Sequence, residues 1–272
     1  MMKKRSKKQN KSPLLAVGCA VLLTVVLLLV LGGRSNLDDE IKSGKAYLES
    51  LEEKNPDEVR QVRKAIRKAE LEAQRDELLD QLAEGTLDPL SIFEDYALMG
   101  DSRSVGFEYW NFLDPNRVFA NSGDTILSVD EQLGTLTSLN PATIYLCYGL
   151  NDMKIGIWPT AEEYAAAYME VVDAIHAKLP DTTIVISSIL PAQDPAFSQS
   201  AAWYDIAAWN EVLEKACEEH DVLFANCDEM AQEQLDLWDP DGIHFQAAFY
   251  PHWSRCLIET MLSDEIIVTE DT

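Results

Sequence analysis

The chain has 272 residues, which is enough for one large domain or two small ones, and its hydrophobic fraction of 47% is typical of a globular protein. Its formal net charge is −25, but the first eleven residues hold six of the 22 basic residues and no acidic one. The chain beyond residue 33 therefore has 16 basic residues against 47 acidic ones. Such an acidic surface repels polyanions, which excludes nucleic acid as an expected partner.

The N-terminal region predicts a membrane anchor. Residues 14–31 form an apolar run of 18 residues that is interrupted only by Thr24, and such a run can span a bilayer. The basic residues ahead of it favour a cytoplasmic segment over 1–12, a transmembrane helix over 13–33 and the rest of the chain outside the cell. The alternative is a secretory signal cleaved after one of the two glycines that follow the run, although its apolar region would be shorter.

Residues 34–89 predict a helical stalk and a linker. The stretch 38–84 is rich in Glu, Lys, Arg, Leu and Ala and is broken once by an Asn-Pro pair, which indicates two helices with sparse apolar stripes. Two interpretations are left open: a stalk or hairpin that self-associates or binds a partner, or a helical pair packed on its own domain. Gly85 to Pro89 carries turn formers, so the next domain is expected over residues 90–272.

From residue 90 onward, short apolar runs rich in β-branched residues alternate with amphipathic helical patterns. This alternation predicts a parallel sheet covered by helices on both faces. Ligands bind beyond the carboxyl ends of the strands in such sheets, so chemistry is expected just after each run. The helices are expected over residues 104–112, 128–138, 160–178, 203–220 and 246–263. The five expected strands are Tyr96 to Met99, Val118 to Ala120, Thr143 to Cys147, Thr183 to Ser188 and Val222 to Ala225.

Polar residues follow the first three strands. Ser102 lies where the first strand gives way to a helix, and taken alone it is best interpreted as a helix cap, a role that serine favours. Gly123 follows the second strand and Asn151 the third. Their N–H groups could stabilise an oxyanion, although glycine and asparagine are also ordinary turn residues.

The segment after the fifth strand holds Asp241 and His244, three residues apart. In this spacing the carboxylate can orient the imidazole and stabilise the imidazolium that forms when a serine loses its proton. The same segment hints at a calcium loop, but Tyr250 stands where the acidic twelfth residue would be, so no metal is expected. His252, in the last helical region, is the rival base.

In this order the residues resemble the SGNH (GDSL-like) hydrolases, here of a membrane-anchored bacterial type, over about residues 94–263. The four blocks of that family are similar to Gly100-Asp101-Ser102, to Gly123, to Gly149-Leu150-Asn151-Asp152 and to Asp241-Gly242-Ile243-His244. The resemblance implies a flavodoxin-like, three-layer αβα sandwich with Ser102 as nucleophile and with Asp241 and His244 completing a triad. It also implies an oxyanion hole made by the N–H groups of Ser102 and Gly123 and the side chain of Asn151.

One residue departs from the family pattern, because Arg103 stands where the family commonly has leucine or another apolar residue. Arg103 could meet a carboxylate or phosphate of the substrate, or pair with one of the many surface acids. Tyr148, Trp158 and Trp238 could stack on sugar rings near the mouth of the site, although a core or rim position is the favoured interpretation of each.

The cysteines outside the apolar run show no C-x-x-C spacing, so a zinc site is not expected. Buried free thiols are the default interpretation, and a disulfide between Cys227 and Cys256 is an open alternative. The remaining two are Cys147 and Cys217.

Together these features predict an extracytoplasmic esterase that uses neither a metal nor an organic cofactor. The resemblance and the outward location favour short acyl groups, such as acetyl, on cell-surface or environmental glycans. Two alternatives are kept open. A glycan O-acetyltransferase would use the same acyl-enzyme with a membrane partner, and a non-catalytic envelope scaffold would bind glycan without turnover.

Overall fold

The computed structural model describes residues 41–47 and 56–264. The predicted cytoplasmic segment and transmembrane helix lie outside these described residues, so both stay predictions. Among the helices that are described, none combines the length and the apolarity that a membrane span requires. The chain divides into two compact units, Met1–Ala73 with Ile266–Thr272 and Gln74–Glu265.

The first unit contains a helix over residues 41–47 and the N-terminal part of α3 (Pro56–Ala83). α3 begins at the proline of the Asn-Pro pair, where the helical stretch was expected to break. Proline suits the first turn of a helix, because the N–H that it lacks would have no partner there. Ile41, Val62 and Ile66 line one apolar pocket, so the two sparse apolar stripes lie beside each other.

The second unit begins within α3, and Leu82 in the last turn of that helix is only 1% exposed. The predicted linker follows as a tight turn. Asp88 accepts a hydrogen bond from the backbone N–H of Leu90 at 3.0 Å and thereby caps a 3-10 turn over Pro89–Ile92. Residues 93–95 then lead from this turn into the first strand.

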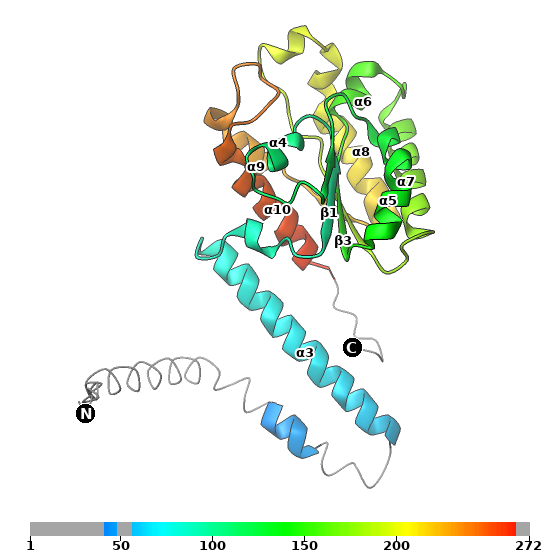
Figure 1. Cartoon of the computed structure of the whole chain (residues 1–272), viewed down its shortest axis with the longest axis vertical. Coiled ribbons are helices and arrows are strands. Elements are labelled where there is room, and N and C mark those ends of the chain that lie inside the picture. Colours follow the sequence, from blue (N-terminus) through cyan, green and yellow to red (C-terminus); the bar gives the residue numbers. More distant parts are fainter. Residues whose placement is uncertain (1–40, 48–55, 265–272) are drawn as a thin grey trace, which may run out of the picture. The chain divides into compact units, whose positions relative to one another are not determined.

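A parallel sheet forms the centre of the second unit (Figure 1). Its strand order is β2-β1-β3-β4-β5, and every neighbouring pair is parallel. The five strands match the expected ones to within one residue at each end, because each is a short apolar run; the three inner strands, β1, β3 and β4, are buried on both faces, and the edge strands β2 and β5 only partly. Their bounds are Tyr96–Gly100 (β1), Val118–Ala120 (β2), Thr143–Cys147 (β3), Thr183–Ser187 (β4) and Leu223–Ala225 (β5).

Helices cover both faces of the sheet, which gives a three-layer αβα arrangement (Figure 1). The main ones are α4 (Val105–Tyr109), α5 (Val129–Leu139), α7 (Ala161–His176), α8 (Ile206–Glu219) and α10 (Tyr250–Leu262). One face of the sheet packs against α5, α7 and α8, and the other against α4 and α10. Successive strand residues point to opposite faces: Met99 and Leu146 lie in the first core, Leu98 and Tyr145 in the second.

The sequence patterns do not predict two short helices, α6 (Leu150–Ile155) and α9 (Asp228–Glu233). Each has six residues, which is too few for a periodic apolar pattern to be recognised. α6 follows β3 and α9 follows β5, so both begin at the carboxyl edge of the sheet. This edge also holds the candidate catalytic residues.

The structure resolves the state of the four cysteines. Cys227, just before α9, forms a disulfide with Cys256 in α10. Cys147 and Cys217 are buried free thiols. The default interpretation of free thiols is therefore wrong for the first pair, whose Cα atoms lie 6.0 Å apart and within the reach of a disulfide. This bond fastens the start of α9 to α10.

Candidate active site

The candidate catalytic residues come together at the carboxyl edge of the sheet. Ser102 follows β1, Gly123 follows β2, and Asn151 lies in the first turn of α6 after β3. Because β1 pairs with both β2 and β3, the loops after these strands converge at the point where the strand order reverses. Ligands bind at such a switch point in open parallel sheets. The loop ahead of α10 adds Asp241 and His244.

A chain of hydrogen bonds joins Ser102, His244 and Asp241. His244 Nε2 lies 3.0 Å from Ser102 Oγ, and His244 Nδ1 lies 2.6 Å from Asp241 Oδ2. A proton on Nδ1 would be held by the carboxylate, which leaves Nε2 as the acceptor for the hydroxyl proton. The His244 side chain is 39% exposed, so a substrate can reach the pair from solvent.

The backbone of the loop fixes the carboxylate. Asp241 Oδ1 accepts hydrogen bonds from the N–H groups of Ile243 at 2.8 Å and His244 at 3.0 Å. Partial burial raises the pKa of the Asp241 carboxyl, but these bonds and the His244 side chain outweigh that effect and hold the pKa below its usual value. Asp241 is therefore ionised at neutral pH, as the partner of a developing imidazolium must be.

Gly242 packs this loop against the segment that follows β4. Its backbone φ is 75°, in the left-handed region, and its carbonyl accepts the N–H of Gln193 at 2.9 Å. A Cβ at this position would lie only 2.3 Å from the carbonyl oxygen of Gln193. Glycine is the residue that tolerates both the conformation and the approach. The loop that carries the candidate base is thus held by the segment that follows β4.

Three N–H groups are available for an oxyanion. Within the described residues, neither the Ser102 N–H nor the Gly123 N–H donates a hydrogen bond inside the protein. Asn151 Nδ2 donates to the carbonyl oxygen of Asp124 at 2.9 Å, which leaves its second hydrogen for a ligand. Gly123 is exposed, and nothing lies within 4 Å of the position where a Cβ would be.

Asp152 is a further site residue that the sequence reasoning did not single out as functional. It is completely buried, and its Oδ1 accepts the backbone N–H of Ile126 at 3.0 Å. Together with the Asn151 bond to Asp124, this contact holds the loop that carries Gly123 against the start of α6. Its place directly after Asn151, as an acid ahead of an apolar residue, is the signal that could have identified it.

Replacing Asp152 with asparagine is expected to change how stability depends on pH. Burial raises the pKa of the Asp152 carboxyl from 3.8 to about 7. The folded state therefore loses stability as pH rises from about 4 to about 7, because the unfolded chain ionises this group more readily. The asparagine amide would keep an oxygen for Ile126 without titrating. We expect the stability of Asp152→Asn relative to the native protein to rise by roughly 2 kcal/mol between pH 5 and pH 8.

Thermal unfolding of both proteins at the two pH values measures this effect. A gain of about 2 kcal/mol corresponds to roughly 4 to 8 °C in the difference between the melting temperatures. A difference that stays the same at pH 5 and pH 8 would show that Asp152 does not titrate in this range.

Arg103 is buried beside the candidate nucleophile, and its hydrogen-bond partners are backbone carbonyls rather than surface acids. It is 3% exposed, and its guanidinium donates to the carbonyl oxygens of Leu190 and Pro191. Burial lowers the pKa of Arg103 to about 10, so it is still charged at neutral pH. Both terminal nitrogens donate to backbone carbonyls, and Nε is buried without a hydrogen-bond partner among the described residues.

The aromatic candidates take core and rim positions. Tyr148 and Trp238 are 2% and 6% exposed, so neither presents a ring face to solvent. Trp158 is partly buried, with its ring centroid 5.4 Å from that of Tyr164. The favoured interpretation of these three residues therefore agrees with their surroundings.

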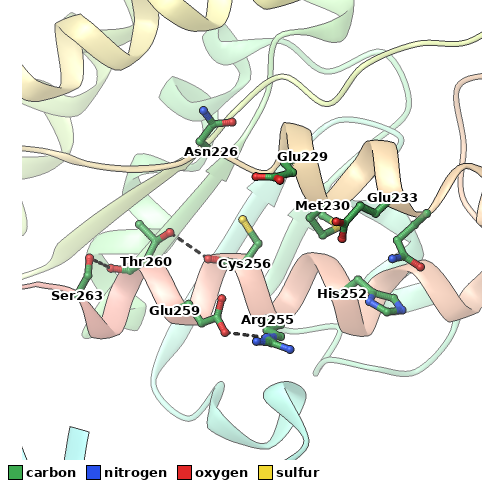
Figure 2. A pocket seen from close by; sticks show the side chains of 11 residues that line it. Asn226, Glu229, Met230, Glu233, His252, Arg255, Cys256, Glu259, Thr260 and Ser263 are labelled. Atoms are coloured by element: carbon green, nitrogen blue, oxygen red, sulfur yellow. Dashed lines mark hydrogen bonds and ion pairs between the residues drawn. The ribbon is translucent and has the colours of Figure 1, made fainter. Parts of the chain in front are cut away.

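His252 lies apart from the hydrogen-bonded chain of the candidate site. It is exposed on α10 and lines a groove between α9 and α10, together with Glu229 and Glu233 (Figure 2). No residue of the candidate triad lines this groove. Among the described residues, no group of three or more His, Cys, Asp or Glu side chains is placed to hold a metal ion.

A serine, a histidine and an aspartate in hydrogen-bond contact at the edge of an α/β sheet define the class of serine hydrolases. Residues 98–251, more than half of the chain, match the GDSL-like Lipase/Acylhydrolase family. The chain therefore belongs to this family and is a serine esterase. None of the curated proteins with which the chain was compared matches it.

Two solved structures, each with a TM-score of 0.50, share the fold. A proposed GDSL-like lipase from Parabacteroides merdae is 18% identical, with a TM-score of 0.50 over 62% of this chain and 95% of that one. A proposed acylhydrolase from Bacteroides fragilis is 17% identical, with a TM-score of 0.50 over 61% of this chain and 85% of that one. The chain is also similar to an acetylxylan esterase from Geobacillus stearothermophilus, which is 16% identical, with a TM-score of 0.47 over 64% of this chain and 95% of that one.

Proposed function

We propose that the protein is an extracytoplasmic esterase that hydrolyses short acyl esters, acetyl esters in particular, through an acyl-enzyme on Ser102. The observation that carries this proposal is the 3.0 Å contact between Ser102 Oγ and His244 Nε2, with Asp241 bonded to the opposite nitrogen of the ring. This arrangement is what a serine needs to become a nucleophile at neutral pH.

The proposed reaction has two halves. His244 Nε2 takes the hydroxyl proton of Ser102 while Oγ attacks the carbonyl carbon of the ester, and the oxyanion lies among the N–H groups of Ser102, Gly123 and Asn151. The tetrahedral intermediate collapses, the bond to the alcohol oxygen breaks, and the alcohol leaves with the proton from His244. Water then attacks the acyl-enzyme in the same way, so that the carboxylic acid is released and the serine is restored.

A small cavity beside the nucleophile turn supports a short acyl group. Asp101 and Arg103, on either side of Ser102, border a cavity of only about 10 Å³ whose other walls include Tyr148 and Leu150. This volume is at most enough for one water molecule. An acyl chain of many carbons could not enter this cavity.

Two features support a location outside the cell. The predicted anchor and its basic flank orient the enzyme domain outward. The disulfide between Cys227 and Cys256 suits an oxidising compartment, because such bonds are rare in the cytosol. An enzyme held on the outer side of the membrane meets cell-surface and environmental glycans first, which is why we propose an ester on a glycan as the substrate.

Two measurements test this proposal: the preference among acyl chain lengths, and whether water or a glycan receives the acetyl group. The full-length protein in detergent should hydrolyse p-nitrophenyl acetate with a kcat/KM at least about tenfold above that for the octanoate ester, since the cavity beside Asp101 and Arg103 is too small for the longer chain. Added glycan should leave free acetate as the product. Acetylated glycan as the main product would identify a transferase instead, and preference for octanoate would overturn the short-acyl assignment.

A further inference from the structure

The side chain of Arg103 joins segments that meet at the nucleophile. Its guanidinium donates to the carbonyl oxygens of Leu190 and Pro191, the second at 2.9 Å, in the segment after β4. Its Cζ atom lies 5.4 Å from the ring centroid of Phe245 and 5.9 Å from that of Trp238, in the loop with the candidate base. One buried cation therefore connects these two segments.

Both partners of the Ser102–His244 contact lie next to this connection. Phe245 directly follows His244, and it pairs with Trp238 in an antiparallel bridge with ring centroids 4.9 Å apart. Ser102 directly precedes Arg103. A shift of the guanidinium against the rings would thus move the imidazole and the hydroxyl relative to each other.

Separate hydrogen bonds hold the backbone of Arg103. Its N–H donates to Asp101 Oδ1 at 2.9 Å, and its carbonyl oxygen accepts the hydroxyl hydrogen of Tyr250 at 2.9 Å. The nucleophile turn is therefore fixed independently of the guanidinium. What the side chain adds is the link from this turn to the loop of His244.

We propose that Arg103 is a positioning residue whose guanidinium sets the separation between Ser102 Oγ and His244 Nε2. The inference rests on the proposed function, because it assigns a role within that catalytic pair. It also gives a reason for the departure from the apolar residue that is common at this position: an apolar side chain could fill the space but could not bond two carbonyl groups.

Lysine cannot replace arginine in this role. The planar guanidinium can donate to two carbonyl oxygens while it stacks against aromatic rings, whereas an ammonium is a point donor on a flexible stem. Without the planar guanidinium, one buried carbonyl loses its hydrogen-bond partner, and the rings of Trp238 and Phe245 lose their contact with it. A displacement of about 1 Å between reacting groups can lower the rate by about 100-fold.

The test compares Arg103→Lys with a matched variant, Arg117→Lys. Arg117 also donates to a backbone carbonyl, that of Tyr96 at 2.8 Å, and lies over an aromatic ring at 5.7 Å, but it does so at the opposite end of β1. We expect kcat for p-nitrophenyl acetate and the rate of modification by a fluorophosphonate to fall by about 10- to 100-fold in Arg103→Lys, with KM changed less than about threefold. Arg117→Lys should retain the native rates.

Chemical rescue separates positioning from folding. Millimolar ethylguanidinium should raise kcat of Arg103→Ala by about tenfold, and ethylammonium should not, because only the first restores the planar fork. The inference is overturned if folded Arg103→Lys has native kcat, if ethylguanidinium has no effect, or if neither variant folds, since Arg103 would then serve stability alone. Loss of activity in Ser102→Ala alongside native Arg103→Lys would leave the proposed function standing.

Discussion

Substituting Ser102 with alanine is expected to reduce kcat for p-nitrophenyl acetate by about 10⁴- to 10⁶-fold. Loss of the nucleophile removes the acyl-enzyme route altogether, and what is left is the stabilisation that the oxyanion donors give to direct attack by water. KM should change little, since the Oγ atom contributes little to ground-state binding. Steady-state kinetics on the full-length protein in detergent measure the effect.

The matched control for this prediction is Ser138→Ala. Ser138 is exposed on α5, and its hydroxyl donates only to the carbonyl oxygen of Gly134 within the same helix. This variant should keep the native kcat. Both variants should unfold within about 2 °C of the native protein, because each loses at most one hydroxyl contact. A folded Ser102→Ala protein with native kcat would refute the nucleophile assignment.

Substituting Asn151 with alanine is expected to lower kcat by about 100- to 1,000-fold. The second hydrogen of its Nδ2 is a donor for the charge that develops on the carbonyl oxygen, and loss of one such donor typically costs this much. The effect should appear in kcat rather than KM, because a neutral ester oxygen gains less from the donor than an oxyanion does.

Asn151 also holds the Gly123 loop through the carbonyl oxygen of Asp124, so a control must loosen that loop alone. Asn121→Ala does this, because Asn121 Nδ2 donates to Asp124 Oδ2 at 3.0 Å in the same loop. We expect Asn121→Ala to lose less than about fivefold in kcat. Equal losses in the two variants would mean that Asn151 acts by holding the loop rather than by stabilising the oxyanion.

The strands and the residues that follow them were predictable from local patterns. Each strand is a short apolar run, and such runs stand out in a chain that is otherwise rich in charge. Ser102, Gly123 and Asn151 then acquire a common location from topology alone, because parallel strands present their carboxyl ends at one edge. Asp241 and His244 were predictable as a pair from their spacing.

The role of Arg103 could not be predicted from the sequence, because it depends on contacts with residues far along the chain. Leu190 and Pro191 lie 87 and 88 positions away, and no local pattern indicates that their carbonyl groups face a guanidinium. A charged residue is also expected at the surface, so burial of Arg103 runs against the usual preference. The pairing of Cys227 with Cys256 was undetermined for the same reason: spacing alone does not place two thiols together.

The most direct test of the central claim is to map the residue that a fluorophosphonate modifies. A serine activated by a histidine reacts with such reagents at phosphorus, whereas an ordinary capping serine does not. Mass spectrometry of the labelled full-length protein should find the adduct on Ser102, and labelling should be lost in both Ser102→Ala and His244→Ala. An adduct on another residue, or unreduced labelling of Ser102→Ala, would contradict the assignment of Ser102 as the nucleophile.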